Sequence, residues 1–321
     1  MTEDEEYEFL IRRLQTFRIL PHPFAASDSA ILLAGRLRKE WNGSGITLVL
    51  GAGVSQESDV PDWPSLVSQL ITAALEKFDA SDLTKHLLES DLTEIRKIRF
   101  LESHSRAFRL YIRDCLYEKI RDDKINISLD ALAKFIKNGR AIPRTQTIIT
   151  YNFDDLLEKR LQAAGLHDEI SSIYSERTYR DASGSIQIYH PHGYIPQEGS
   201  LVELLESMIV FSERQYHREY FSQALWNSAV QVKAFTSSTC LFIGFSFSDA
   251  NVRRLLDFAR TVDTAQKTHI AIIRRSKKSS DAQTNNLTDY LTERDLESLG
   301  VAVLWIREYE EIPQILDSIQ I

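Results

Sequence analysis

The sequence has few cysteines, no excess of basic residues and no long apolar run. Only Cys115 and Cys240 are present among 321 residues, and the formal net charge is −8, which argues against nucleic acid as a partner. The longest apolar stretches, 46–54 and 239–245, are shorter than the roughly 18 residues that span a bilayer. The start, MTEDEEYEF, is acidic where a secretory signal is basic. We expect a cytoplasmic protein that binds neither membrane nor nucleic acid directly.

Glycine and proline are both absent from residues 65–138, where apolar residues recur at helical spacing. This pattern predicts several helices, the last of them ending at Gly139. We therefore expect a helical insertion over 65–142. Residues 1–44 also carry apolar side chains at helical spacing and are predicted to form an N-terminal helical extension. Its apolar face could pack on the core or on another subunit, and we favour the subunit contact.

Short apolar runs rich in β-branched residues alternate with helical patterns in the rest of the chain. The runs interpreted as strands are 46–50, 146–153, 185–193, 239–246, 267–275 and 301–307. The polar run 276–286 has no periodicity and is interpreted as a surface loop. Alternation of this kind predicts an α/β fold. We expect a Rossmann-like, mostly parallel sheet with helices on both faces and an inserted helical subdomain. One domain would span 45–321, with 143–321 completing the sheet.

Polar or glycine-rich residues follow four of these runs. Ligands of open parallel sheets bind outside the carboxyl ends of the strands, so these positions are candidate site residues. They are Gly51-Ala52-Gly53, Asn152 to Asp154, His192-Gly193 and Gly244 to Asn251. A glycine turn with free N–H groups suits a phosphate. No third glycine completes the G-x-G-x-x-G pattern, however, and a tight turn without a ligand explains it about as well.

The polar side chains at these positions have structural as well as chemical explanations. Asn152 follows an apolar strand and must find hydrogen-bond partners, among which a ligand is one candidate. Either Asp154 or Asp155 could simply cap the helix that follows. His192 has the side chain best suited to accept a proton near neutral pH, although a loop histidine can be merely structural. Asp249 could likewise cap a helix.

Taken together and in order, these motifs resemble the sirtuin family over roughly residues 45–275. The segment 51–63, GAGVSQESDVPDW, is similar to the family's Gly-Ala-Gly-Ile-Ser followed by Pro-Asp-Phe-Arg. The segment 150–154, TYNFD, resembles Thr-Gln-Asn-Ile-Asp. His192 matches the His-Gly of the family's general base, and 244–249, GFSFSD, resembles its Gly-x-Ser turn.

Three departures narrow the resemblance to one branch of the family. Two cysteines cannot build the Cys₄ zinc site of protein-deacylating sirtuins. Trp63-Pro64 stands in place of Phe-Arg, and Tyr151 in place of Gln. The chain therefore looks more like the zinc-free sirtuin-like domains of bacterial antiphage defence. That resemblance implies an NAD⁺ hydrolase that makes ADP-ribose and nicotinamide, with NAD as its substrate and no metal.

The resemblance also implies residue roles. Asn152 and His192 would be catalytic, Asn152 holding the ribose and a water in line and His192 polarising the ribose hydroxyls or the water. The other matched residues would bind NAD. They are Gly51, Ala52, Gly53 and Ser55 at the pyrophosphate, Gly244, Ser246 and Asp249 at the adenosine ribose, and Asp62 and Asp154 at the nicotinamide end.

An NAD⁺ hydrolase without control would empty its own cell of NAD, so we expect its activity to be withheld until infection. No further domain is expected within the chain, which leaves control to homo-oligomerisation or to a partner such as a HerA-like ATPase or a short Argonaute. Two alternatives remain. A non-catalytic NAD or ADP-ribose sensor or scaffold would not need His192. An NAD-dependent protein deacylase is disfavoured by the missing cysteine pairs. The trigger, the oligomeric state and any cyclic ADP-ribose product stay open.

Overall fold

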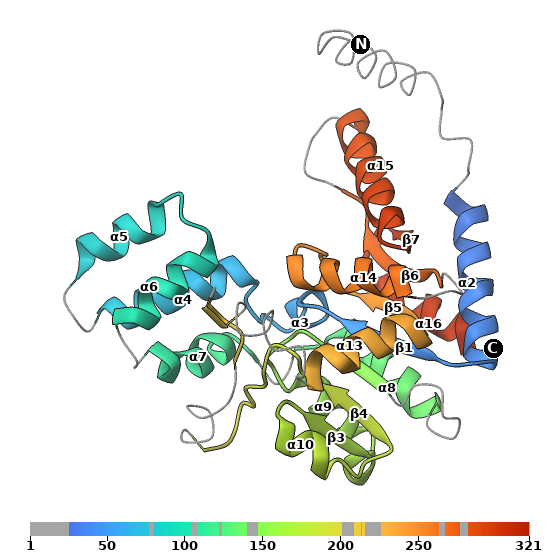
Figure 1. Ribbon diagram of the computed structural model, residues 1–321, viewed down its shortest axis with the longest axis horizontal. Coiled ribbons are helices and arrows are strands. Elements are labelled where there is room, and N and C mark those ends of the chain that lie inside the picture. Colours follow the sequence, from blue (N-terminus) through green and yellow to red (C-terminus); the bar gives the residue numbers. More distant parts are fainter. Residues whose placement is uncertain are drawn as a thin grey trace.

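The sheet is the feature that positions everything else. The computed structural model describes residues 26–76, 80–104, 108–121, 124–139, 147–200, 209–212, 214–215, 226–262, 267–276 and 282–320. Within these ranges, seven strands form one parallel sheet in the order β3-β4-β2-β1-β5-β6-β7 (Figure 1). They are β1 (Ile46–Leu50), β2 (Thr147–Thr150), β3 (Ile170–Ile173), β4 (Ile186–Tyr189), β5 (Thr239–Ile243), β6 (His269–Arg274) and β7 (Val301–Ile306). The predicted Rossmann-like α/β fold is confirmed.

Both faces of the sheet are apolar, and helices cover both. Successive side chains of a strand point to opposite faces. In β1, Ile46, Leu48 and Leu50 accordingly join one core cluster and Val49 the other. The first cluster is covered by α2 (Ala26–Asn42), α8 (Ile127–Gly139), α9 (Leu156–Ala163) and α16 (Ile312–Gln320). The second is covered by α13 (Trp226–Ser237), α14 (Ala250–Val262) and α15 (Ala282–Ser298).

Four helices form a lobe beside the sheet, at the left of Figure 1. They are α4 (Trp63–Glu76), α5 (Ser81–Glu89), α6 (Glu94–His104) and α7 (Phe108–Tyr117), and α4 contacts the other three. Helix α8 lies instead on the sheet, against α9 and α16. The glycine-free stretch thus supplies both a lobe and one helix of the sheet layer. The domain limits 1–44, 65–142 and 143–321 remain predictions.

Helix α2 is the part of the N-terminal extension that the structure describes, while residues 1–25 lie outside it. Leu37 and Trp41 are buried, and the Trp41 ring lies 4.5 Å from that of Phe135 in α8. The helix contacts α16, β1 and β7 of its own chain. Leu37 and Trp41 therefore pack on the sheet layer of the same chain, whereas Ile31 is 69% exposed. The favoured subunit contact stays a prediction for the rest of the extension.

Other differences from the sequence-based expectations concern short or polar segments. Strand β3 and helix α10 (Glu176–Asp181) were not expected. The segment interpreted as a surface loop enters α15 at Ala282. The expected strands also extend too far at their carboxyl ends, because the chain leaves the sheet where the candidate site begins.

The shorter elements are α3 (Gly53–Gln56), η1 (His167–Glu169) and η2 (Tyr309–Glu311). No helix within the described ranges has both the length and the apolar character needed to cross a bilayer.

A buried tyrosine joins the lobe to the sheet. The hydroxyl of Tyr117, at the end of α7, lies 2.6 Å from the carbonyl oxygen of Ile195 and 3.0 Å from a carboxylate oxygen of Asp155. It also accepts the backbone N–H of Asp155 at 3.0 Å. The other carboxylate oxygen of Asp155 accepts the N–H of Gln197. One side chain therefore ties α7 to the loops that follow β2 and β4.

Replacing Tyr117 should weaken the connection between α7 and the sheet loops and so lower the stability of the fold. Tyr117→Phe leaves a buried N–H and a buried carbonyl without their partner, so we expect the free energy of unfolding to fall by about 1 to 3 kcal/mol in urea titrations. Tyr179→Phe is the matched control, since that ring is 45% exposed, and it should change stability by less than about 0.5 kcal/mol. Equal effects of the two substitutions would contradict the role of the Tyr117 hydroxyl.

Candidate functional site

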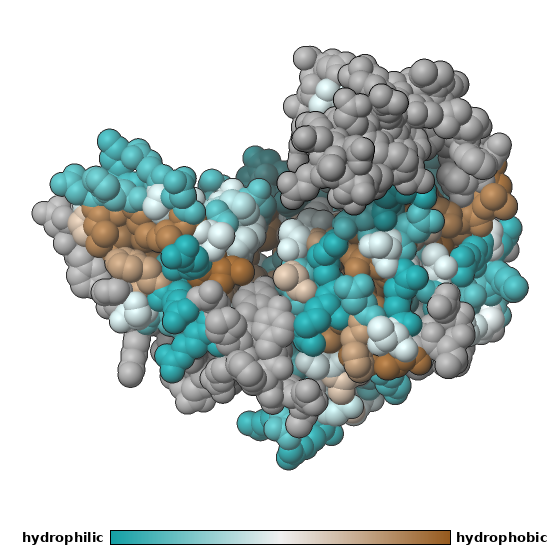
Figure 2. Space-filling view, turned by 45° about the horizontal axis from the view of Figure 1, so that its top comes forward, coloured by the Kyte–Doolittle hydropathy of each residue, from teal (hydrophilic) through white to brown (hydrophobic). Residues whose placement is uncertain are grey.

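A cleft of about 1030 Å³ opens at the carboxyl edge of the sheet. Strand β1 lies between β2 and β5 in the sheet. The strand after β1 is added on one side of it and the later strands on the other, so the carboxyl edge at β1 is the topological switch point. Figure 2 shows the surface hollowed between the lobe of α4–α7, at left, and the sheet-bearing body. Residues of both parts line the cleft.

Ten of the eleven predicted site residues line this one cleft. They are Gly51, Ala52, Gly53, Asp62, Asn152, Asp154, His192, Gly244, Ser246 and Asp249. The eleventh, Ser55, is buried beneath the cleft and contacts Asn152. Residues as far apart in the sequence as Gly51 and Asp249 are brought together because the carboxyl ends of parallel strands share one edge. Their individual roles remain predictions.

The two glycine turns are packed against each other. A Cβ on Gly51 would lie 2.6 Å from the carbonyl oxygen of Gly244, and one on Gly53 would lie 2.7 Å from its Cα. Gly244 itself has φ +65°, and its Cβ would lie 2.5 Å from the nitrogen of Val54. The N–H groups of Gly51 and Gly53 donate to Ile243 and Gly244. The expectation of free N–H groups is therefore wrong for these two glycines, because the turn after β5 already occupies them.

Asn152, Ser55 and Asp154 form a hydrogen-bonded chain in the floor of the cleft. The Asn152 amide donates to the Ser55 hydroxyl at 2.9 Å, and Ser55 is hydrogen-bonded in turn to the Asp154 carboxylate. Asp154 also accepts the N–H of Leu156, the first residue of α9, whereas the N-cap residue of that helix is Asp155 and its side chain makes no cap hydrogen bond. Burial raises the pKa of the Asp154 carboxyl to about 6, despite the hydrogen bonds from Ser55 and Leu156. A carboxyl that titrates this close to neutral pH is typical of a functional site.

His192 and Asp249 pair across the cleft. The Nε2 of His192 lies 3.2 Å from Oδ2 of Asp249, while Oδ1 of Asp249 accepts the N–H groups of Asn251 and Val252. Burial alone would raise the pKa of the Asp249 carboxyl, but the hydrogen bond and charge of His192 and the two backbone N–H groups lower it to about 2. An ionised carboxylate only accepts, so Nε2 must carry a proton. When the ring is neutral, Nδ1 is therefore the nitrogen that carries no proton.

Asp62 and the loop after β5 are held by local contacts. The Asp62 carboxylate accepts the N–H of Ser65 and so caps α4, while its residue lines the cleft. The neighbouring Trp63 ring lies 4.9 Å from that of Phe211. In the loop after β5, Phe247 is buried with φ +57°, a left-handed conformation that costs a non-glycine residue energy. Strain of this kind is characteristic of loops that shape a site.

Sequence reasoning missed the residues at the carboxyl end of β6. Ile273, Arg274, Arg275 and Ser276 line the cleft next to the turn after β5. The rule that located the other residues, the carboxyl end of a parallel strand, would also have found these. Among the described residues, no three His, Cys, Asp or Glu side chains gather as a metal site requires. Cys115 and Cys240 are both buried with free thiols.

Comparison with known proteins gives one family and several relatives. Residues 146–299 match the model of the SIR2-like domain, which agrees with the resemblance found in the sequence. A protein named NAD(+) hydrolase ThsA from Enterococcus faecium is 25% identical over 284 residues, which is 84% of this chain and 54% of that protein. Its namesakes from Acinetobacter baumannii and Bacillus cereus are 23% and 22% identical, over 90% and 84% of this chain and 55% and 52% of theirs. The chain spans about half the length of the curated relatives that it matches.

The buried carboxyl of Asp154 should destabilise the fold at neutral pH. Its folded pKa of about 6 lies above the unfolded value, so the cost is absent below about pH 4, grows up to about pH 6 and then stays constant. Asp154→Asn is expected to raise the free energy of unfolding at pH 7 by roughly 2 kcal/mol and to change little at pH 3. Urea titrations across this range test the point, and a loss of stability at pH 7 would contradict it.

The carboxylate of Asp249, by contrast, should stabilise the fold at neutral pH. Its folded pKa of about 2 lies below the unfolded value, so its stabilisation is complete above about pH 4 and is lost as the pH falls through 2. Asp249→Asn is expected to lower the free energy of unfolding at pH 7 by roughly 2 kcal/mol, with the difference from wild type shrinking below pH 4. Asp317→Asn removes a half-exposed ion pair with Lys134 as a control and should cost less than about 0.5 kcal/mol. A pH-independent effect of Asp249→Asn would count against the pairing.

Proposed function

We propose that the chain hydrolyses NAD⁺ to nicotinamide and ADP-ribose, because residues 146–299 match the model of the SIR2-like domain. One observation carries this function: the amide of Asn152 and the imidazole of His192, matched to the family's Asn and His, line the same cleft as both glycine turns. The relatives named as NAD(+) hydrolases support it. The cleft volume of about 1030 Å³ has room for a dinucleotide.

The charges of the cleft fit this substrate. Nicotinamide leaves as a neutral base, so the positive charge of NAD⁺ passes to the ribose as the bond between its anomeric carbon and the ring nitrogen breaks. The Asp249 carboxylate is ionised and Asp154 is largely ionised above pH 6. These buried anions stabilise the cationic ribose far more than they would in bulk water. Arg274 and Arg275 lie at another part of the cleft, where they favour the anionic pyrophosphate.

The attacking water needs a partner that takes its proton. With Nε2 of His192 donating to Asp249, Nδ1 of the neutral ring receives that proton, directly or through a ribose hydroxyl. The oxygen of the water forms the new bond to the anomeric carbon, and the products are ADP-ribose, nicotinamide and a proton. Asn152 holds ribose and water in line, since Ser55 occupies one N–H of its amide and leaves the oxygen and the other N–H available.

The remaining residues bind NAD in this proposal. The turn of Gly51, Ala52 and Gly53 approaches the pyrophosphate, and Ser55 acts from beneath by holding Asn152. Gly244 and Ser246 shape the site of the adenosine ribose, whereas Asp249, which was expected there, acts with His192 at the nicotinamide ribose. Asp62 lies at the nicotinamide end as the cap of α4.

The biological role follows from the same resemblance. We propose that the protein acts in the cytoplasm in antiphage defence by depleting NAD. Control would come from homo-oligomerisation or from a separate partner such as a HerA-like ATPase or a short Argonaute, because an uncontrolled hydrolase would harm its own cell.

The test of function is the chromatographic measurement of NAD⁺, nicotinamide and ADP-ribose over time, with the purified full chain alone and with the product of any neighbouring gene. Asn152→Ala and His192→Ala are each expected to lower kcat at least about 100-fold, in the range found when a general base or a positioning group is removed. Asn227→Ala removes a buried amide of α13 outside the cleft and should leave kcat within about threefold.

Two results would overturn the proposal in different ways. Binding of NAD⁺ without turnover under every condition would identify a sensor or scaffold. Loss of an acetyl group from a peptide only when NAD⁺ is supplied would identify a deacylase. Full activity of the lone chain would leave the hydrolase intact but would contradict control by a partner.

A further inference from the structure

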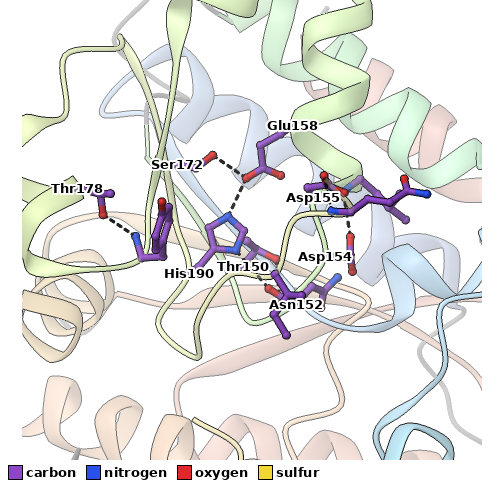
Figure 3. A network of polar contacts seen from close by, with 12 residues as sticks. Thr150, Asn152, Asp154, Asp155, Glu158, Ser172, Thr178 and His190 are labelled. Carbon is purple, nitrogen blue, oxygen red and sulfur yellow. Dashed lines mark hydrogen bonds and ion pairs between the residues drawn. The ribbon is translucent and has the colours of Figure 1, made fainter. Parts of the chain in front are cut away.

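A buried pair of titratable side chains lies directly behind the candidate site and has no part in the proposed reaction. His190 follows β4 and Glu158 belongs to α9, and their exposed fractions are 1% and 2%. The Nε2 of His190 lies 2.7 Å from Oε1 of Glu158. Figure 3 shows the imidazole between Glu158 on one side and the backbone of Asn152 on the other.

The second ring nitrogen of His190 contacts the backbone of Asn152. Nδ1 lies 3.2 Å from the Asn152 carbonyl oxygen. A carbonyl oxygen only accepts hydrogen bonds, so Nδ1 must carry a proton. Nε2 then either donates to an ionised Glu158 or accepts from a protonated one. In both states Glu158 orients the ring so that Nδ1–H points at the carbonyl.

The pair is itself held in place. The hydroxyl of Ser172 in β3 donates to Oε1 of Glu158 at 2.9 Å. The Tyr194 ring packs 4.5 Å from the His190 ring and is hydrogen-bonded to Ser172. The other carboxylate oxygen, Oε2 of Glu158, is buried without a partner among the described residues. Burying a carboxyl group with an unpaired oxygen costs free energy, so a contribution to stability alone does not account for the pair.

We propose that His190, oriented by Glu158, is a positioning residue for Asn152. Three contacts hold Asn152: its N–H donates to Thr150, its amide to Ser55, and its carbonyl accepts from His190. The third fixes the peptide plane between Asn152 and Phe153 and so the direction of the amide in the cleft. This inference rests on the proposed NAD⁺ hydrolysis. Because the remaining contacts to the dinucleotide are unchanged, loss of the His190 contact should lower kcat and spare KM.

The experiment compares three variants of the full chain. His190→Phe removes the donor and keeps a ring of similar size, and kcat should fall by about 10- to 100-fold while KM for NAD⁺ stays within about threefold. His190→Asn places an amide N–H near the position of Nδ1 and should recover part of the lost kcat. His269→Phe is the matched control: His269 is also buried and accepts the N–H of Cys240 at 3.1 Å, but it does not line the cleft. It should lower the melting temperature without lowering kcat.

A second readout does not depend on activity or on the phenylalanine variant folding. In the ¹⁵N NMR spectrum of histidine-labelled wild type, one Nδ1 should carry a slowly exchanging proton, and its signal should vanish in His190→Asn. A bare Nδ1 on His190 would overturn the inference even if NAD⁺ is hydrolysed. Unchanged kcat in His190→Phe would also overturn it, as would equal losses of kcat in His190→Phe and His269→Phe. Absence of NAD⁺ turnover by wild type would instead refute the proposed function.

Discussion

The contact between two backbone turns holds the candidate site together. The turn after β1 and the turn after β5 approach so closely that Gly51, Gly53 and Gly244 leave no room for a Cβ. Two polar contacts of the cleft link residues that follow these turns to side chains of other loops. Ser55 reaches Asn152 because it lies two residues beyond Gly53, and Asp249 reaches His192 because its loop starts at Gly244. The chemistry of the cleft therefore depends on a packing constraint of the backbone.

The surroundings of two carboxyl groups in this cleft shift their pKa values in opposite directions. Burial raises the pKa of both carboxyl groups. The hydroxyl and single N–H that bind Asp154 do not offset this effect, whereas the imidazole and two N–H groups that bind Asp249 outweigh it. The same side chain thus provides a group that titrates near neutral pH at one position and a fixed negative charge at the other. Divergent pairs of this kind are the pattern from which acid–base roles in enzymes are commonly assigned.

The fold and the location of the site were accessible from sequence, but the contacts within the site were not. Glycine turns and polar residues after apolar runs identify strand ends, and sheet geometry brings those ends together. Strand β3 was missed because Ser171 and Ser172 dilute its apolar character. The pairing of His190 with Glu158 leaves no local pattern, since the residues lie 32 positions apart on different elements. Likewise, no spacing rule predicts that Asp249 binds His192.

The position of β1 also bears on how the polypeptide can be divided. The segment that matches the SIR2-like model begins at residue 146, yet β1 lies at 46–50, in the middle of the sheet between β2 and β5. A fragment cut at the start of that match would lose its central strand, leaving β2 and β5 with unpaired edges and exposed apolar faces. The limits of the matched family segment are thus not those of an autonomous folding unit, and the first half of the chain supplies the central strand and part of the candidate site.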